Sequence, residues 1–429
     1  MRSSARCEMR AQLERDFERF KRELPRDFPA HVRDTYRIDL GARYLGHPLP
    51  HPIGKGSGQL SLSQEQLESD RVAGLAFVVL KTVIAEDPEG IRSMGAWAIH
   101  ETRMKVERRV SEGGREGWTV TWKGRGWDRS FEDYLALVRT AADLTRAREL
   151  VAVPSVKYHL PRLDEPFRAA EYEHTTGLLA LAWGGARLSL EKDFSPTLAG
   201  DELADEQARI LRWLREVPDQ IRRSVSDGAV RLALKLMNAR FDDAFQLEML
   251  TAAASADALV VFNRLWDPVS GVAFGGHDLS ERNCRVLRQA RSEGRALPPL
   301  TGSGNVCSGR MILEYARLGC ESVQLHTFFQ LPLSEYPATE GSRSQRALHA
   351  LVFHPTDGLI AGMLELESRG AIERQGGELR FLDVPGSGAT SARRHEGHEE
   401  QQPRSLLFGL LGSCCRDLYW PFVTFVSSW

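Results

Sequence analysis

The sequence has few cysteines, and they are not grouped. Its 429 residues contain six, with no C-x-x-C pair among them. This argues against an iron–sulfur cluster, a zinc site or a disulfide framework, so we expect no metal and the reduced thiols of a cytoplasmic protein. The sequence also lacks G-x-G-x-x-G and the Gly-Lys-Ser/Thr ending of a P-loop, so it has no recognisable nicotinamide-binding domain. The cysteines are Cys7, Cys284, Cys307, Cys320, Cys414 and Cys415.

The sequence also lacks an excess of one charge and a long uninterrupted apolar run. Lys and Arg together number 56 and Asp and Glu 58, so no overall field favours nucleic acid as a partner. The N-terminus has no apolar stretch of signal-peptide length, and we expect no export. The apolar segment 405–429 is interrupted by Arg416, Asp417 and Pro421, which disfavours a spanning helix. Membrane contact through a terminal segment is the weaker alternative.

What the sequence does contain is a series of short apolar runs, each followed by a longer helical pattern. The runs are near-continuous in Val, Leu and Ala rather than alternating, as is typical of parallel strands buried on both faces. Eight alternations of strand and helix predict an α/β protein with a (β/α)₈ TIM barrel. The runs begin near residues 51, 75, 149, 186, 230, 256, 297 and 320.

Additional segments surround this predicted barrel. Residues 1–37 predict an N-terminal amphipathic helical segment, and 38–335 the barrel. Two strand-like stretches around a glycine-rich turn, in the long connection after the second strand, predict an inserted hairpin at the rim. Residues 336–384 predict an appended helix and hairpin. The remaining residues, 385–429, predict a disordered linker followed by an apolar tail.

Polar residues mark the carboxyl ends of the predicted strands, where barrels of this kind carry their active sites. A buried lysine is costly unless it meets an anion, so three lysines at these ends indicate an anionic ligand. The glycine-rich stretch "GSGNVCSGR" (302–310) follows the seventh strand, and a turn before a helix there is typical of a phosphate site. The polar residues at these ends are Ser57, Gly58, Lys81, Thr82, Lys157, Ser195, Lys235, Asn263, Ser303, Gly304, Asn305, His326 and Thr327.

Several blocks of the sequence together resemble the dihydroorotate dehydrogenase family. The first is "DLGARYLGHPLPHPIGKGSGQLS", followed by "VAGLAFVVLKTV". The blocks "RLALKLM", "ADALVVFNRLWDP", "FGGHDLSERN" and "LTGSGNVCSGRMILEYARLGCESVQLHT" follow in the order and spacing of that family. The resemblance covers roughly residues 38 to 332, and the co-linear order makes it specific.

The resemblance implies an FMN-containing barrel that acts in pyrimidine metabolism or on a related substrate. It implies Ser195 as the proton acceptor, with Lys81 as the second catalytic candidate, while hydride passes to the flavin. The oxidant for reduced flavin would come from outside the chain: quinone, fumarate, oxygen or a partner protein. The residues that would bind FMN are Ser57, Gly58, Lys81, Thr82, Lys235, Asn263, Gly275, Gly276, Ser303, Gly304, Asn305, His326 and Thr327.

The sequence departs from the family where the substrate would bind. Lys192 and Thr197 stand where the family has asparagines, and only Asn263 remains in a matching place. A site built on amide hydrogen bonds loses selectivity without them, which argues against dihydroorotate itself and leaves a small dihydropyrimidine-like molecule or an enone. Two other functions stay open: a flavin-free barrel for a phosphate-bearing ligand, acting as an isomerase or lyase, and a non-catalytic binding protein.

Overall fold

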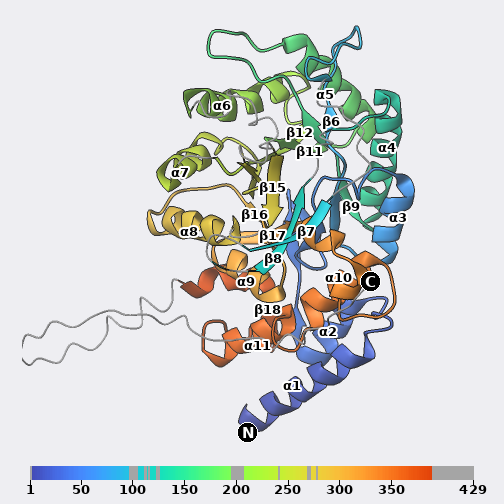
Figure 1. Ribbon diagram of the computed structural model, residues 1–429, viewed down its shortest axis with the longest axis vertical. Helices are drawn as coiled ribbons and strands as arrows, with labels where there is room; N and C mark the ends of the chain where they lie inside the picture. Colours follow the sequence, from blue (N-terminus) through green and yellow to red (C-terminus); the bar gives the residue numbers. More distant parts are fainter. Residues whose placement is uncertain are drawn as a thin grey trace, which may run out of the picture.

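The computed structural model shows an α/β protein built around one curled parallel sheet (Figure 1). It describes residues 2–388 with the exception of 96–104, 111–113, 115, 122–125, 195–206, 240–241, 268–271 and 277–278.

The curled sheet has ten strands in the order β6-β10-β11-β12-β13-β16-β17-β4-β5-β9, and every pairing in it is parallel. This arrangement is TIM-barrel-like, and the parallel strands expected from the apolar runs are confirmed. The strands are β4 (Ile53–Lys55), β5 (Phe77–Val79), β6 (Val83–Ile84), β9 (Val151–Val153), β10 (Ser155–Lys157), β11 (Leu188–Asp193), β12 (Val230–Lys235), β13 (Ala258–Val261), β16 (Leu300–Ser303) and β17 (Cys320–Leu325).

Eight predicted runs give ten strands because two runs are interrupted. Residues 80–82 separate β5 from β6, and Pro154 alone separates β9 from β10. Proline has no backbone N–H to donate to a neighbouring strand, which accounts for the second break. Strand β5 pairs with β9, and strand β6 pairs with β10, so the two interrupted runs lie side by side along their whole length.

Helices cover the outside of this sheet, with α6, α7 and α8 along one side and α3 and α4 along the other (Figure 1). Several begin at a serine or aspartate whose side chain accepts a hydrogen bond from the first turn, as at Ser63, Ser130, Asp242 and Ser308. The helices are α3 (Gln64–Val72), α4 (Phe131–Ala147), α5 (Ala169–Trp183), α6 (Gln207–Arg223), α7 (Asp243–Ala252), α8 (Leu279–Ser292) and α9 (Gly309–Arg317).

A smaller antiparallel sheet joins two loops that follow carboxyl ends of the parallel strands. The predicted hairpin is present as β7 (Lys105–Val110) and β8 (Glu116–Thr121). Strand β8 pairs with β15 (Val272–Gly276), and β15 pairs with β14 (Leu265–Asp267). The hairpin inserted after the second strand is therefore held by the segment that follows the sixth.

The two terminal segments of the described chain pack against each other at the lower end of Figure 1. Strand β1 (Ile38–Asp39) pairs in parallel with β18 (Leu379–Arg380), and the ring of Phe17 stacks on His349. The elements here are α1 (Arg2–Arg19), α2 (Phe28–Tyr36), α10 (Arg343–Phe353) and α11 (Leu359–Ser368), with the hairpin β2 (Ala42–Tyr44) and β3 (His47–Leu49) and the 3₁₀ segments η3 (Thr327–Gln330), η4 (Leu333–Glu335) and η5 (Phe381–Gly388).

The segment after the barrel differs from the expected helix and hairpin. It forms two helices, α10 and α11, because Pro355 and Gly358 end the first and begin the second. Its strand β18 pairs with β1 instead of forming an extended hairpin; a single bridge joins Gln375 and Glu378.

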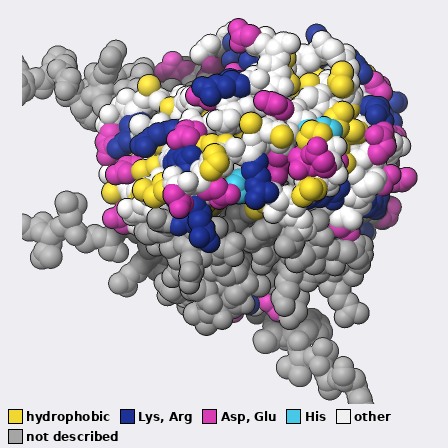
Figure 2. All heavy atoms as spheres, turned by 90° about the horizontal axis from the view of Figure 1, so that it is seen from above, with side chains coloured by type: hydrophobic (Ala, Val, Ile, Leu, Met, Phe, Trp, Pro, Cys, Tyr) yellow, Lys and Arg dark blue, Asp and Glu magenta, His cyan; other side chains and the backbone are white. Residues whose placement is uncertain are grey.

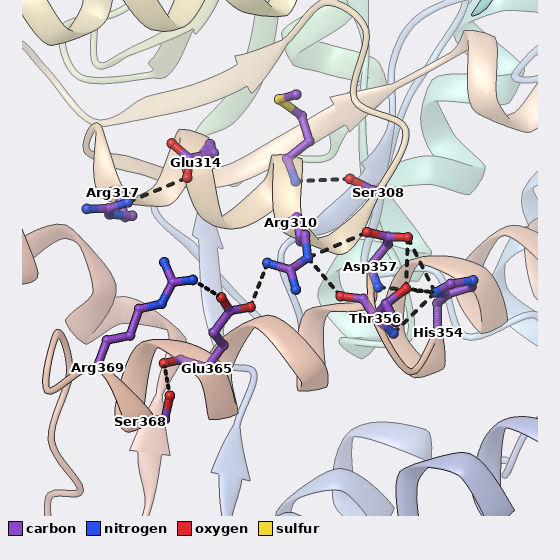
Figure 3. Close-up of polar contacts among 11 residues, drawn as sticks. Ser308, Arg310, Glu314, Arg317, His354, Thr356, Asp357, Glu365, Ser368 and Arg369 are labelled. Carbon is purple, nitrogen blue, oxygen red and sulfur yellow. Dashed lines mark hydrogen bonds and ion pairs between the residues drawn. The ribbon is translucent and has the colours of Figure 1, made fainter. Parts of the chain in front are cut away.

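Polar contacts fasten helix α9 to this appended pair of helices (Figure 3). The guanidinium of Arg310 donates to the carbonyl of Thr356 at 2.8 Å and lies 2.6 Å from Glu365. The backbone N–H of Arg310 donates to the carbonyl of Asp357 at 3.1 Å. The loop before α11 therefore occupies part of the N-terminal end of α9.

The surface shows no field of a single sign on the face drawn in Figure 2, where acidic, basic and hydrophobic side chains are interspersed. Within the described parts of the chain, no helix is both long enough and apolar enough to cross a membrane.

Candidate functional site

Charged side chains gather at the carboxyl ends of neighbouring parallel strands. They come from the break after β5 and from the ends of β10, β11, β12 and β13, and each is at most 8% exposed. Burial in this number is unusual because an ionised group loses its hydration. Cations outnumber carboxylates here, which suits an anionic ligand. These residues are Lys81, Lys157, Asp193, Lys235 and Arg264.

Asp193 is the carboxylate at the centre of this group. Its Oδ2 lies 3.4 Å from the ammonium of Lys157 and accepts a hydrogen bond from Thr82 Oγ1, also at 3.4 Å. Although burial alone would raise it, the pKa of Asp193 is held below its usual value by the charges of Lys157, Lys235 and Lys192. Asp193 is therefore ionised at neutral pH.

A second buried carboxylate, Glu191, lies one layer deeper on the same strand. Its Oε2 accepts hydrogen bonds from Tyr44 Oη at 2.8 Å and from Gln324 Nε2 at 2.6 Å. Its Oε1 lies 3.7 Å from Lys235 Nζ. Burial raises the pKa of Glu191, and the charge of Lys235 opposes that rise. The ring of Tyr44, from the β2–β3 hairpin, stacks on Phe77 and so holds its hydroxyl in place.

Two nitrogen bases at the carboxyl ends of the strands, Lys81 and His326, have pKa values that are shifted towards their neutral forms. Burial, together with the charges of Lys157 and Arg264, lowers the pKa of Lys81 to about 7. The charges of Asp193 and Asp128 oppose this lowering of the pKa of Lys81. Burial and nearby cations also place the pKa of His326 well below its usual value. An amine with a pKa near 7 can take or give a proton at neutral pH.

Two of the predicted hydroxyl groups, those of Ser57 and Thr82, are brought together next to Asp193, with Ser155 beside them. Ser57 Oγ lies 2.8 Å from Thr82 Oγ1, which lies 3.0 Å from Ser155 Oγ. The adjacent Gly58 has no room for a side chain, because an added Cβ would lie 1.9 Å from His326 Nε2. The predicted residues from the first, second and eighth strands therefore do converge.

The glycine-rich loop after β16 turns its carbonyl groups inward. The carbonyl of Ser303 accepts hydrogen bonds from Asn283 Nδ2 and Tyr315 Oη, at 2.8 and 2.7 Å. Gly304 and Asn305 both have positive φ values, 89° and 52°. Within the described part of the chain, nothing accepts a hydrogen bond from the backbone N–H groups of 304–308. A row of such amides can bind an anion.

Three of the glycines near this loop are required by packing. A Cβ on Gly302 would lie 2.6 Å from the ring of Tyr315, and one on Gly304 would lie 2.5 Å from Asn283 Nδ2. A Cβ on Gly309 would lie 2.1 Å from the backbone nitrogen of Leu359. The glycine spacing in the sequence thus reflects close packing as well as any ligand.

The remaining predicted residues lie in different settings. Asn263, two positions after the end of β13, donates its backbone N–H to the carbonyl of Leu236 at 2.7 Å. Gly275 and Gly276 belong to β15 and pair with β8, so the antiparallel sheet already uses their backbone. Thr327 begins η3. Ser195 lies outside the described residues, two positions after the end of β11.

Sequence reasoning missed the acidic side of the site. Asp193, Glu191 and Tyr44 were not among the expected residues, although a glutamate and an aspartate within the run "ARLSLEKDF" are unusual for a buried strand. Among the described residues, no group of three or more His, Cys, Asp or Glu side chains is arranged to bind a metal ion.

Fold and site together define a TIM-barrel-like α/β protein with a buried, mainly cationic cluster at the carboxyl ends of its parallel strands. No protein-family model matches the chain, and a search of the curated proteins finds no match.

Proposed function

We propose that this protein is an FMN-dependent oxidoreductase of the dihydroorotate dehydrogenase type, with the ten strands forming the eight runs of a (β/α)₈ barrel. The observation that carries the proposal is the set of buried lysines, Lys81, Lys157 and Lys235, at the carboxyl ends of three strands. Buried cations are favourable beside carboxylates or an anionic ligand; Lys157 and Lys235 lie 3.4 and 3.7 Å from the carboxylates of Asp193 and Glu191, and an anionic ligand would add to this balance.

The residues present fit FMN at both of its ends. The ring system would lie along Ser57, Gly58, Lys81 and Thr82, with the imidazole of His326 packed against Gly58. The phosphate would meet the backbone amides of 304–308; the resemblance also assigns Thr327 to it. When bound, FMN supplies a hydride acceptor.

The chain's own residues would then bind, orient and move protons. Lys235 supplies a cation, and Glu191 at 3.7 Å limits where its ammonium can lie. Ser195, two positions after Asp193 in the sequence, would accept the substrate proton. Lys81, with a pKa of about 7, is a buried group that could relay that proton.

The first test is the flavin content of the purified protein. We expect a yellow protein with the visible absorbance of flavin, or one that takes up FMN at a ratio near one to one. Replacing Lys235 with Met should weaken FMN retention and lower the flavin's reduction potential, because a nearby cation is lost. A matched control is Lys21→Met, at a half-exposed lysine paired with Glu18. A colourless protein that takes up no FMN would rule out the proposal.

A flavin-free lyase or isomerase is the second candidate, and one observation favours it. Lys81 is buried beside Lys157 and Arg264, and an amine with a lowered pKa is the nucleophile that forms Schiff bases with carbonyl substrates. Incubation with small keto or aldehyde phosphates and borohydride would then add mass at Lys81, as read by peptide mass spectrometry. An FMN-loaded protein with no such adduct would exclude this candidate.

A further inference from the structure

One oxygen of Asp193 has no hydrogen-bond donor among the residues that the structure describes. Asp193 ends β11 and is only 6% exposed. Its Oδ2 faces Lys157 and Thr82, each at 3.4 Å. Its Oδ1 is buried and accepts no hydrogen bond from any described residue. At the carboxyl end of β11, where the candidate site lies, one oxygen of the Asp193 carboxylate therefore has hydrogen-bonding partners and the other has none among the described residues.

The missing partner of Oδ1 must be a donor. The surrounding lysines keep Asp193 ionised, and an ionised carboxylate only accepts hydrogen bonds. A buried acceptor without a donor has lost the free energy of its hydration with nothing in its place, and this loss is larger when the acceptor is charged. A ligand that brings an N–H or O–H to this point recovers that free energy, whereas one that brings a carbonyl oxygen does not.

We propose that Asp193 is a specificity-determining residue that accepts a hydrogen bond from the substrate, so that the substrate's bound edge carries an N–H or O–H donor. The proposal rests on the proposed function for its choice of site. A hydrogen bond to Asp193 would disfavour cyclic enones as substrates, because they carry no N–H or O–H group. Lys81 and Lys157 beside Asp193 are donors that suit a neighbouring carbonyl or oxyanion of the same molecule. A substrate edge that carries a hydrogen-bond donor next to an acceptor would match one carboxylate with two neighbouring ammonium groups.

Binding of donor-bearing and donor-free probes tests the role of Asp193. The probes are 5,6-dihydrouracil, its 1,3-dimethyl derivative and cyclohex-2-enone, titrated into protein with and without added FMN and followed by thermal shift and calorimetry. We expect the wild type to bind dihydrouracil at least about tenfold more tightly than the dimethyl derivative or the enone.

The isosteric variant Asp193→Asn should remove this preference. Its amide oxygen would stay with the donors Lys157 and Thr82, which turns the NH₂ group towards the ligand and sets donor against donor. We expect the two pyrimidine probes to bind this variant within about threefold of each other. Asp227→Asn, at an exposed aspartate, is the control and should keep the wild-type ratio.

Equal binding of the two pyrimidine probes by the wild type overturns the proposal even if the variant does not fold. So does a preference that persists in Asp193→Asn, or the absence of binding by every probe. FMN content is read separately by absorbance. A protein that prefers the donor-bearing probe but takes up no FMN would support the role of Asp193 and contradict the proposed function. A protein that takes up FMN but shows no such preference would support the proposed function and contradict the role of Asp193.

Discussion

Lys81 lies in the break between β5 and β6 with a pKa of about 7, against an ordinary value of 10.5. Below pH 7 both the folded and the unfolded chain hold its proton. Between pH 7 and about 10.5 only the unfolded chain does, so the contribution of Lys81 to stability rises with pH through that window. The cost of burying the charged ammonium is therefore largest at acidic and neutral pH.

The variant Lys81→Met should be more stable than the wild type at pH 6.5, by on the order of 1 kcal/mol or more, because it removes that cost. The difference should shrink towards pH 10. Urea unfolding midpoints across this pH range measure it, with Lys21→Met as the surface control. A difference that is constant with pH would mean that Lys81 keeps its proton throughout.

A substitution of Ser195 would distinguish a role in proton transfer from a role in FMN binding. If it accepts the substrate proton, Ser195→Ala should keep its FMN and reduce it with substrate at least about a hundredfold more slowly, the usual range for a lost general base. Reoxidation should be unaffected. Anaerobic stopped-flow absorbance with any substrate found by screening measures both steps, and a variant that is reduced at the wild-type rate would exclude this role.

At the scale of secondary-structure elements, the packing of α9 against α11 depends on Gly309. The three atoms nearest to a Cβ there are backbone atoms of Leu359, Gly358 and Leu351, at 2.1 to 2.5 Å. No side-chain rotation can relieve such contacts, so Gly309→Ala should push the helices apart and destabilise the protein by about 1–3 kcal/mol.

The control for Gly309 is Gly177, in the interior of α5 with no atom within 4 Å of an added Cβ. Gly177→Ala should stabilise the protein by about 0.5–1 kcal/mol, because alanine favours the helix. Urea unfolding midpoints compare the two substitutions. Equal effects would show that α9 and α11 are not in the close contact described.

The strands and helices can be predicted from sequence because their signals are local. The apolar runs near 230 and 256 are found as β12 and β13, and the hairpin 105–121 as β7 and β8. The pairing of β8 with β15 has no such signal, since the two segments lie about 150 residues apart and nothing in either composition specifies the other.

The same limit applies to the candidate site. The strand-end lysines are visible because a lysine that ends an apolar run is unusual, and three of them lie together as expected. The contact of Tyr44 with Glu191 and Gln324 joins three distant positions, so it becomes visible only once the sheet has curled. The role of Ser195 and the binding of FMN remain predictions.

For the molecule as a whole, the buried cations and the loop 304–308 predict stabilisation by a phosphate-bearing ligand. A ligand at a hundred times its dissociation constant contributes about 2.7 kcal/mol to the folded state. FMN should therefore raise the unfolding temperature by more than riboflavin does at the same concentration, because riboflavin has no phosphate to meet those amides. Differential scanning fluorimetry measures this, and equal shifts would place the anion site elsewhere.

The pairing of β1 with β18 also bears on how the chain is made. The paired residues Ile38 and Leu379 lie about 340 positions apart. At the usual rate of synthesis, the N-terminal strand leaves the ribosome roughly 20 to 70 seconds before its partner. During that interval the edge of β1 lacks its final neighbour, so the N-terminal segment stays incompletely paired until the last elements emerge.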